Sequence, residues 1–211
     1  MKKTLISLGV IGLLAGTATF AWGRWHANTS FNRTYVNPVY SVPTASLTTE
    51  EQEALIKMRQ EEKLARDVYL TLYDKYGLRI FANIAKSEQR HTDTVKYLLD
   101  KYGVEDPVTD DTVGVFKDAE FTNLYNQLVA QGSQSVVDAL KVGATIEDLD
   151  IKDLEDEIVK TDKYDLQRVF SSLKRGSYNH MRAFVAWLNY YGSDYQPQFI
   201  SQDEFDSILG R

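Results

Sequence analysis

Residues 87–92 read Ser-Glu-Gln-Arg-His-Thr, which places a carboxylate and an imidazole three positions apart. On a helix, Glu88 and His91 project from one face and can hold the same ion. They interrupt an apolar stripe whose steps alternate between three and four residues and whose other members are Phe81, Ile84, Val95 and Leu98. Because a carboxylate and an imidazole are costly to bury without partners, the stretch predicts matching polar groups on other helices at the same depth.

The composition is typical of one soluble domain with short extensions. The chain has 211 residues, of which 43% are hydrophobic and 26% are charged, and its net charge is −6. The absence of cysteine excludes disulfides, iron–sulfur clusters, thiolate zinc sites and cysteine nucleophiles. The acidic balance argues against nucleic acid as a partner. Chemistry that needs an imidazole has only His26, His91 and His180 to use.

The N-terminus predicts an export signal over residues 1–22. A short basic start is followed by 19 uncharged, mainly apolar residues, 4–22. This pattern is typical of a signal peptide with a cleavage site near Ala21, and the same length also suits an uncleaved membrane anchor. Both interpretations place the protein outside the cytoplasm, secreted, periplasmic or anchored, and the membrane is contacted only through this segment. Residues 23–47, rich in Asn, Thr, Ser and Pro, predict an extended linker.

The rest of the chain predicts an all-α fold, a bundle of four long helices over residues 48–192. A short loop makes the first two helices antiparallel neighbours. The connection over residues 103–133 is longer than a hairpin needs, so we expect it to cross the bundle and the third helix to begin where the second begins. Residues 193–211 form a tail that packs on the bundle. The long helices are expected at residues 48–76, 79–102, 135–160 and 164–191, and a short crossover helix at 119–131.

Each of the other three long helices also carries polar residues in its predicted core seam. Glu62 lies in the first helix, Glu147 in the third, and Ser177 and His180 in the fourth. Counted at ~1.5 Å per residue from the two short turns, they fall at nearly the depth of Glu88. Three carboxylates in one interior layer repel each other and lose their hydration, and two divalent cations would cancel that charge. Carboxylates together with imidazoles suit iron, manganese or zinc better than magnesium or calcium.

Four segments stand out beside these residues: EEKLARDVY (61–69), FANIAKSEQRH (81–91), VGATIEDLDIKDL (142–154) and GSYNHMRAF (176–184). Through them the chain resembles the ferritin-like superfamily, and more closely a prokaryotic ferritin-like family labelled as a domain of unknown function. The likeness extends over residues 48–205. The separation of Glu62 and Tyr69 is also similar to the E-x6-Y spacing of rubrerythrin-like helices.

The resemblance implies a site and a chemistry. Members of the superfamily typically bind two iron ions and react with dioxygen or peroxide as ferroxidases, peroxidases or oxidases. Tyr69 is expected near the metals, either as a donor or radical site in catalysis or as a group that hydrogen-bonds a ligand carboxylate. The ligands implied by the match to the superfamily motif are Glu62, Glu88, His91, Glu147 and His180.

Ser177 departs from the superfamily pattern, which has a glutamate at this position. Serine leaves three carboxylates against a charge of +4. Asp150, one turn after Glu147, is a candidate replacement ligand. The alternatives are a weak or absent second metal, or solvent in the vacant position. Two iron ions are the first expectation, and manganese, zinc or a single metal are the others.

Three functions follow from this sequence. The first is an exported dimetal protein that oxidises ferrous iron or reduces peroxide or dioxygen. The second is a metal-binding module without turnover, and the third is a metal-free bundle for interactions at the cell surface. The expected partners are metal ions and dioxygen or peroxide. The sequence leaves open whether the chain forms a homodimer. We also expect Glu88 and His91 to bind the tighter metal and the His180 side to be more open.

Overall fold

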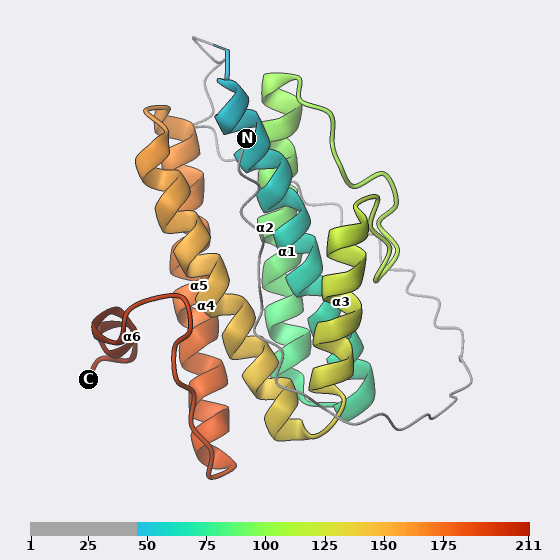
Figure 1. Ribbon diagram of the computed structural model, residues 1–211, viewed down its shortest axis with the longest axis vertical. Helices are drawn as coiled ribbons and strands as arrows, with labels where there is room; N and C mark the ends of the chain where they lie inside the picture. The colour runs from blue at the N-terminus through green and yellow to red at the C-terminus, as the bar shows by residue number, and fades with distance from the viewer. Residues whose placement is uncertain (1–45) are drawn as a thin grey trace. The chain divides into compact units, whose positions relative to one another are not determined.

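The computed structural model describes residues 46–211, and every regular element in this range is an α-helix (Figure 1). The predicted all-α class is therefore confirmed. Each of the four long helices begins and ends within one residue of its expected bounds. The helices are α1 (Thr49–Tyr76), α2 (Arg79–Tyr102), α3 (Ala119–Gly132), α4 (Val136–Lys160), α5 (Tyr164–Tyr190) and α6 (Gln202–Leu209).

The predictions for the N-terminus concern residues that the structure does not describe. The expected signal segment, 1–22, lies outside the described residues, as does the expected linker except for residues 46–47. Within residues 46–211, no helix combines the length and the apolar character that crossing a membrane requires. Export and anchoring therefore stay predictions.

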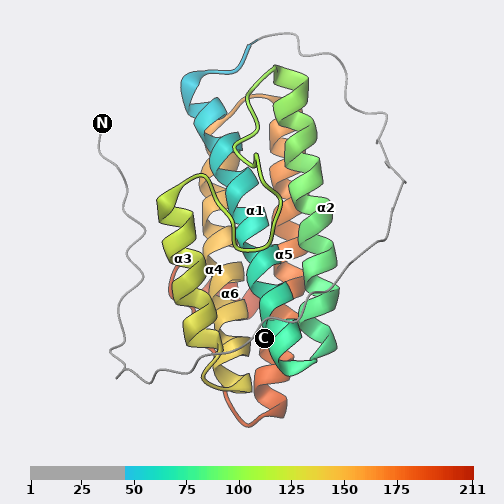
Figure 2. The same ribbon diagram turned by 90° about the vertical axis from the view of Figure 1, so that its right-hand side faces the viewer.

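The four long helices pack side by side as two antiparallel pairs. The first pair is α1 with α2 and the second is α4 with α5, and the pairs meet where α1 packs on α4 and α2 packs on α5. Helices α2 and α4 begin at the same end (Figures 1 and 2), as the long connection between them predicted. All four helices thus turn one face toward a shared interior.

Local signals position α1 along its axis. The main-chain N–H of Glu51 donates to Oγ1 of Thr48 at 3.2 Å, and the N–H of Thr48 donates to Oε2 of Glu51 at 2.9 Å. This capping box satisfies two of the free N–H groups at the helix start. At the other end, Gly77 has a φ of +66°, a left-handed conformation that costs glycine little. Because both ends are determined locally, so is the depth at which each seam residue of α1 lies.

The shared interior is apolar on both sides of one layer, in which the polar seam residues of the four long helices lie. Beyond the layer, toward the end of α1, the rings of Tyr69, Phe81 and Phe184 pack with centroids 5.4 to 6.4 Å apart. Gly143 on α4 permits this packing, because a Cβ there would lie 2.4 Å from the ring of Phe184. On the other side, toward the start of α1, the buried side chains include Leu55, Met58, Val95, Leu98, Leu154, Phe170 and Leu173.

Buried charges hold the crossover against the bundle. The side chains of Lys63 and Asp67 on α1 are both 0% exposed and form an ion pair at 2.5 Å. Lys63 also donates to the carbonyl of Thr112 at 3.0 Å, and the N–H of Gly114 donates to Asp67 at 2.9 Å. Figure 2 shows this part of the crossover passing over α1. A buried charge persists only when it is paired and hydrogen-bonded, so this network fixes the path of the crossover.

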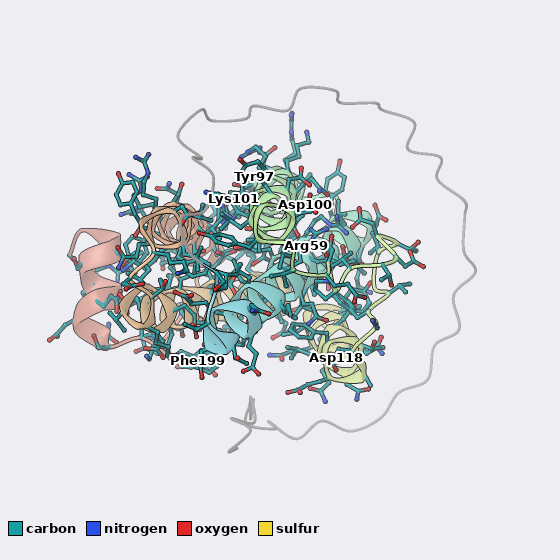
Figure 3. All side chains as sticks on the ribbon, turned by 90° about the horizontal axis from the view of Figure 1, so that it is seen from above. Arg59, Tyr97, Asp100, Lys101, Asp118 and Phe199 are labelled. Carbon is teal, nitrogen blue, oxygen red and sulfur yellow. The ribbon has the colours of Figure 1, made fainter. Side chains whose placement is uncertain are left out.

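The tail is held in a similar way by Asp148 on α4. Its carboxylate accepts hydrogen bonds from the Tyr195 hydroxyl at 2.8 Å and from three main-chain N–H groups, those of Gln198 at 2.5 Å, Phe199 at 3.2 Å and Ile200 at 3.0 Å. Arg59 of α1 pairs with Asp106 of the crossover at 3.0 Å, and in Figure 3, viewed from above, Phe199 lies on a different side of the molecule from Arg59. The two non-helical segments are thus attached to the bundle by separate buried charges.

Replacing this anchor is expected to destabilise the protein. Asp148→Ala removes a buried acceptor and leaves four donors without their partner, so we expect a loss of about 3 kcal/mol in the free energy of unfolding measured with urea. Asp156→Ala is the matched control, because Asp156 lies on the same helix with a side chain that is 46% exposed. The control should change stability by less than about 0.5 kcal/mol. Equal losses in the two variants would contradict this role of Asp148.

Candidate metal centre

The polar seam residues of all four long helices meet in one buried layer, which we call the polar layer. Its members are Glu62 from α1, Glu88 and His91 from α2, Glu147 from α4 and His180 from α5. The three glutamates are at most 1% exposed. The layer contains two groups, each with ligand atoms within 4.8 Å of one another. Both groups contain Glu88.

Glu88 links the two groups with one carboxylate oxygen each. Its Oε2 lies 2.7 Å from Nδ1 of His91, and its Oε1 lies 2.8 Å from Nδ1 of His180. The same two nitrogens approach one further carboxylate each: Nδ1 of His91 lies 3.2 Å from Oε2 of Glu62, and Nδ1 of His180 lies 3.3 Å from Oε2 of Glu147. Each half of the layer therefore has one imidazole, one glutamate of its own and one oxygen of the shared Glu88.

The donor atoms fit a transition metal. Oε1 of Glu88 is fully buried and makes no hydrogen bond, although Nδ1 of His180 lies 2.8 Å away, because the approach lacks the required direction. A buried carboxylate oxygen without a hydrogen-bond donor is uncommon, and a cation is one way to satisfy it. Three carboxylates with two imidazole Nδ1 atoms are ligands that suit iron, manganese or zinc.

Burial and ion pairing act on the layer in opposite directions. Burial raises the pKa of Glu62 to about 7, against the opposing effect of His91, and burial also raises the pKa of Glu147. Burial acts on Glu88 as well, yet its pKa is lowered because the two imidazoles outweigh that effect. Burial opposes protonation of the imidazoles, but the carboxylates outweigh it, so the pKa of His180 is raised to about 10 and that of His91 is raised well above its usual value. Without metal, the layer holds its charges through shared protons.

Tyr69 positions Glu147. Its hydroxyl donates to Oε1 of Glu147 at 2.6 Å and lies 3.3 Å from the carbonyl oxygen of Gly143. Burial, and then the charge of Glu147, raises the pKa of Tyr69 well above its usual value, so the hydroxyl keeps its proton. The hydrogen bond turns the other oxygen of Glu147 toward His180.

Ser177 and Gly176 make room on α5. Ser177 is buried, but its hydroxyl donates to the carbonyl of Leu173 on its own helix at 3.4 Å. A Cβ at Gly176 would lie 2.5 Å from Cε1 and 2.6 Å from Nε2 of His91. The glycine therefore allows His91 to approach α5. Gly176 was not predicted from the sequence, although a glycine inside a long helix beside a polar seam position is a signal for such a close approach.

Asp150 is buried but belongs to neither group of close ligand atoms. Burial, and then the charges of Glu62 and Glu147, raises its pKa well above the usual value. Glu61, one residue from the core seam and absent from our sequence-based set, is also buried. Burial, against the opposing charge of Lys57, raises the pKa of Glu61 to about 8.

The two histidines are almost equally accessible. The side chain of His91 is 13% exposed and that of His180 is 10% exposed. This small difference does not test the expectation that the His180 side of the site is more open, which stays a prediction.

Comparison with known proteins gives the family. Residues 51–211 match the family described as "Uncharacterized protein domain (DUF2202)". The chain is a member of the DUF2202 family. This DUF2202 chain is 59% identical over 171 residues to the uncharacterized protein MJ0754 of Methanocaldococcus jannaschii, which covers 81% of this chain and 92% of that protein. All residues of the polar layer lie inside the part that matches DUF2202.

A solved structure is also similar to this DUF2202 protein. It is described as the crystal structure of hypothetical protein MJ0754 from Methanococcus jannaschii DSM 2661. The TM-score is 0.79 at 59% identity, and the match covers 82% of this chain and 98% of that one. The arrangement of the described helices is therefore similar to that of this solved structure.

The polar layer makes stability depend on pH when metal is removed. The pKa of a histidine in an unfolded chain is about 6.5. In the folded chain it is raised to about 10 for His180, so this stabilisation is complete below the unfolded value and is lost as pH rises toward the folded value. Glu62 acts in the same direction at lower pH, because its carboxyl pKa is raised from 4.5 to about 7 and the folded chain therefore holds more protons up to that pH. We expect chelator-treated protein to lose at least about 2 kcal/mol in urea unfolding between about pH 7 and about pH 10, and His180→Gln to lose less. Stability that rises over this range would contradict the assignment.

Gly176→Ala tests the approach of His91 to α5. In an exposed helix position this change normally stabilises by about 0.5–1 kcal/mol. Here the added methyl would overlap His91, so we expect a destabilisation of about 1–3 kcal/mol in urea unfolding and a shift of the His91 ring signals in NMR spectra. Ser172→Ala, at an exposed position of α5, is the control and should leave the ring signals in place. A more stable Gly176→Ala variant would show that the ring is not held as described.

Proposed function

We propose that this DUF2202 protein has the ferritin-like four-helix fold and that its polar layer is a carboxylate–histidine dimetal centre. The order of the helices supports the fold, because ferritin-like bundles have two antiparallel pairs joined by one long crossover. The observation that carries the site is the position of Glu88. One oxygen of this side chain faces each of two equivalent groups, as a carboxylate shared by two ions would.

The two ions would have equivalent ligands. Glu62 and His91 would hold the first ion and Glu147 and His180 the second, with Glu88 between them. These three glutamates carry less negative charge than two divalent ions need, so Asp150 is the fourth carboxylate in our proposal. Asp150 would supply the negative charge of the glutamate that the superfamily pattern has at the position of Ser177. We propose iron as the metal, with manganese and zinc as alternatives for the same ligands.

We propose oxidation of ferrous iron, or reduction of peroxide or dioxygen, as the activity. Bound iron supplies the redox chemistry, and the chain supplies binding, orientation and a dry surrounding. Tyr69 holds one oxygen of Glu147 at 2.6 Å and thereby leaves the other for the metal. The rings of Phe184 and Phe81 pack against Tyr69 and make its surroundings apolar. An extracytoplasmic location is also part of the proposal and rests on the pattern of residues 1–22.

One observation favours a second candidate, a metal-free interaction bundle. Nδ1 of each histidine lies within 3.3 Å of two carboxylates, so protonated imidazoles can neutralise the layer without metal. Such a network would set the helix register in the way that buried polar residues do in coiled coils. The two candidates differ in whether Glu88 is needed for metal or only for stability.

Metal content of the Glu88→Gln variant tests the dimetal proposal. We expect wild-type protein reconstituted with ferrous iron without oxygen to hold two ions per chain by elemental analysis. Glu88→Gln keeps the size of the side chain but removes the shared charge, and should lower metal affinity by about 10–100-fold. Asp93→Asn, an exposed change on the same helix, is the control and should retain both ions. Wild-type protein that stays free of metal would refute the proposal and favour the interaction bundle.

Turnover is measured separately from binding. Reconstituted protein should consume ferrous iron and peroxide faster than buffer does, and Glu88→Gln should lose most of this rate. Metal binding without faster consumption would leave a binding module without catalysis.

A further inference from the structure

A second buried acidic group lies between α1 and α4, outside the polar layer. Its carboxylates are Glu61 on α1 and Asp153 on α4, and with Lys57 we call them the side cluster. The Glu61 side chain is only 5% exposed, and neither of its carboxylate oxygens makes a hydrogen bond. Burying a carboxylate in this state is costly, which indicates a position prepared for a cation.

A cation already occupies the side cluster, because the ammonium of Lys57 lies between the two carboxylates. Its Nζ donates to Oδ2 of Asp153 at 2.7 Å. Nζ also lies 3.0 Å from Oε1 of Glu61, an ion pair that lacks the direction of a hydrogen bond. One cation therefore contacts carboxylates from two helices at once. The Lys57 side chain is 38% exposed, so its ammonium can move out to solvent without disturbing the core.

Asp150 connects the side cluster to the polar layer. It lies three residues before Asp153 on α4, and side chains at this spacing share one face of a helix. The charges of Glu61 and of Glu62 both act on buried Asp150. One face of α4 thus carries a partly exposed carboxylate, Asp153, and a buried one, Asp150. A simple ion pair of Lys57 with Asp153 would not need the buried carboxyl groups of Glu61 and Asp150 beside it.

We propose that Glu61 and Asp153 form an accessory site for a divalent transition-metal ion on its way to the polar layer, and that the Lys57 ammonium closes this site until the ion displaces it. Asp150 receives the ion from the side cluster and passes it to the dimetal centre. The exchange breaks no covalent bond, since the metal replaces an ammonium that returns to solvent. The route rests on the dimetal centre proposed above, whereas binding at the side cluster does not.

The rate of metal loading tests the route. Cobalt(II) is mixed with metal-free protein in a stopped-flow instrument, and its visible absorption reports binding without any turnover. Glu61→Gln should load about tenfold more slowly than wild type. Lys57→Met removes the competing cation and should load severalfold faster. Glu61→Gln should still reach two cobalt ions per chain, and Lys57→Met should reach two in the polar layer and a third at the side cluster.

Lys152→Met is the matched control for Lys57→Met. Lys152 lies on α4 with a side chain that is 40% exposed, and it pairs with Asp156 on its own helix. Its removal changes the net charge equally and should leave the loading rate unchanged. Asp153→Asn is the second test of the carboxylates, since Asp153 is partly exposed and the variant is expected to fold. Circular dichroism verifies the fold of each variant.

The outcomes separate the accessory site from the dimetal centre. If wild-type protein takes up two cobalt ions and Glu61→Gln and Asp153→Asn load at the wild-type rate, the route is overturned while the dimetal proposal stands. If wild-type protein takes up no cobalt in the polar layer, the dimetal proposal fails, and the side cluster is tested alone in Lys57→Met. One cobalt ion bound by Lys57→Met and lost on adding Glu61→Gln supports the accessory site, and no bound ion refutes it.

Discussion

The cost of burying three glutamates in one layer governs this structure. Glu62, Glu88 and Glu147 come from three helices and are removed from water, so their charges must be balanced within the layer. The two histidines provide that balance with shared protons, and the proposed metal ions would provide it with positive charge. Either solution requires the four helices to keep one relative depth, because a shift of one turn would leave a buried carboxylate without its partner.

The same constraint explains the other buried charges. Asp67 pairs with Lys63 and holds the crossover, and Asp148 holds the tail through four hydrogen bonds. Each of these two carboxylates accepts at least one hydrogen bond from a non-helical segment, so burial of the charge fixes the path of the chain. The side cluster differs, because Glu61 is buried and its cation, Lys57, comes from a partly exposed side chain. A charge whose partner can leave is suited to exchange, whereas a charge with permanent partners is suited to anchoring.

The helices were predictable because their signals are local. The capping box of Thr48 and Glu51 and the left-handed glycine at Gly77 act within a few residues, and the apolar stripes show which face of each helix is buried. The five residues of the polar layer were predictable for the same reason, since their positions in the stripes and their distances from the turns follow from helix geometry alone. Glu61 and Gly176 were missed because each lies off the stripe, and its importance depends on which neighbouring helix it faces.

The amino-acid sequence by itself determined the helices, their polar seam positions and the depth at which these positions lie, because periodicity and caps operate within one helix. Only the tertiary structure decided that Glu88 is shared by both histidines, that Asp150 is buried outside the two groups of close ligand atoms, and that His91 reaches α5 through the space at Gly176. These facts depend on the rotation of each helix about its axis and on distances between helices. Both are set by the packing of all four helices together and are encoded in no single segment.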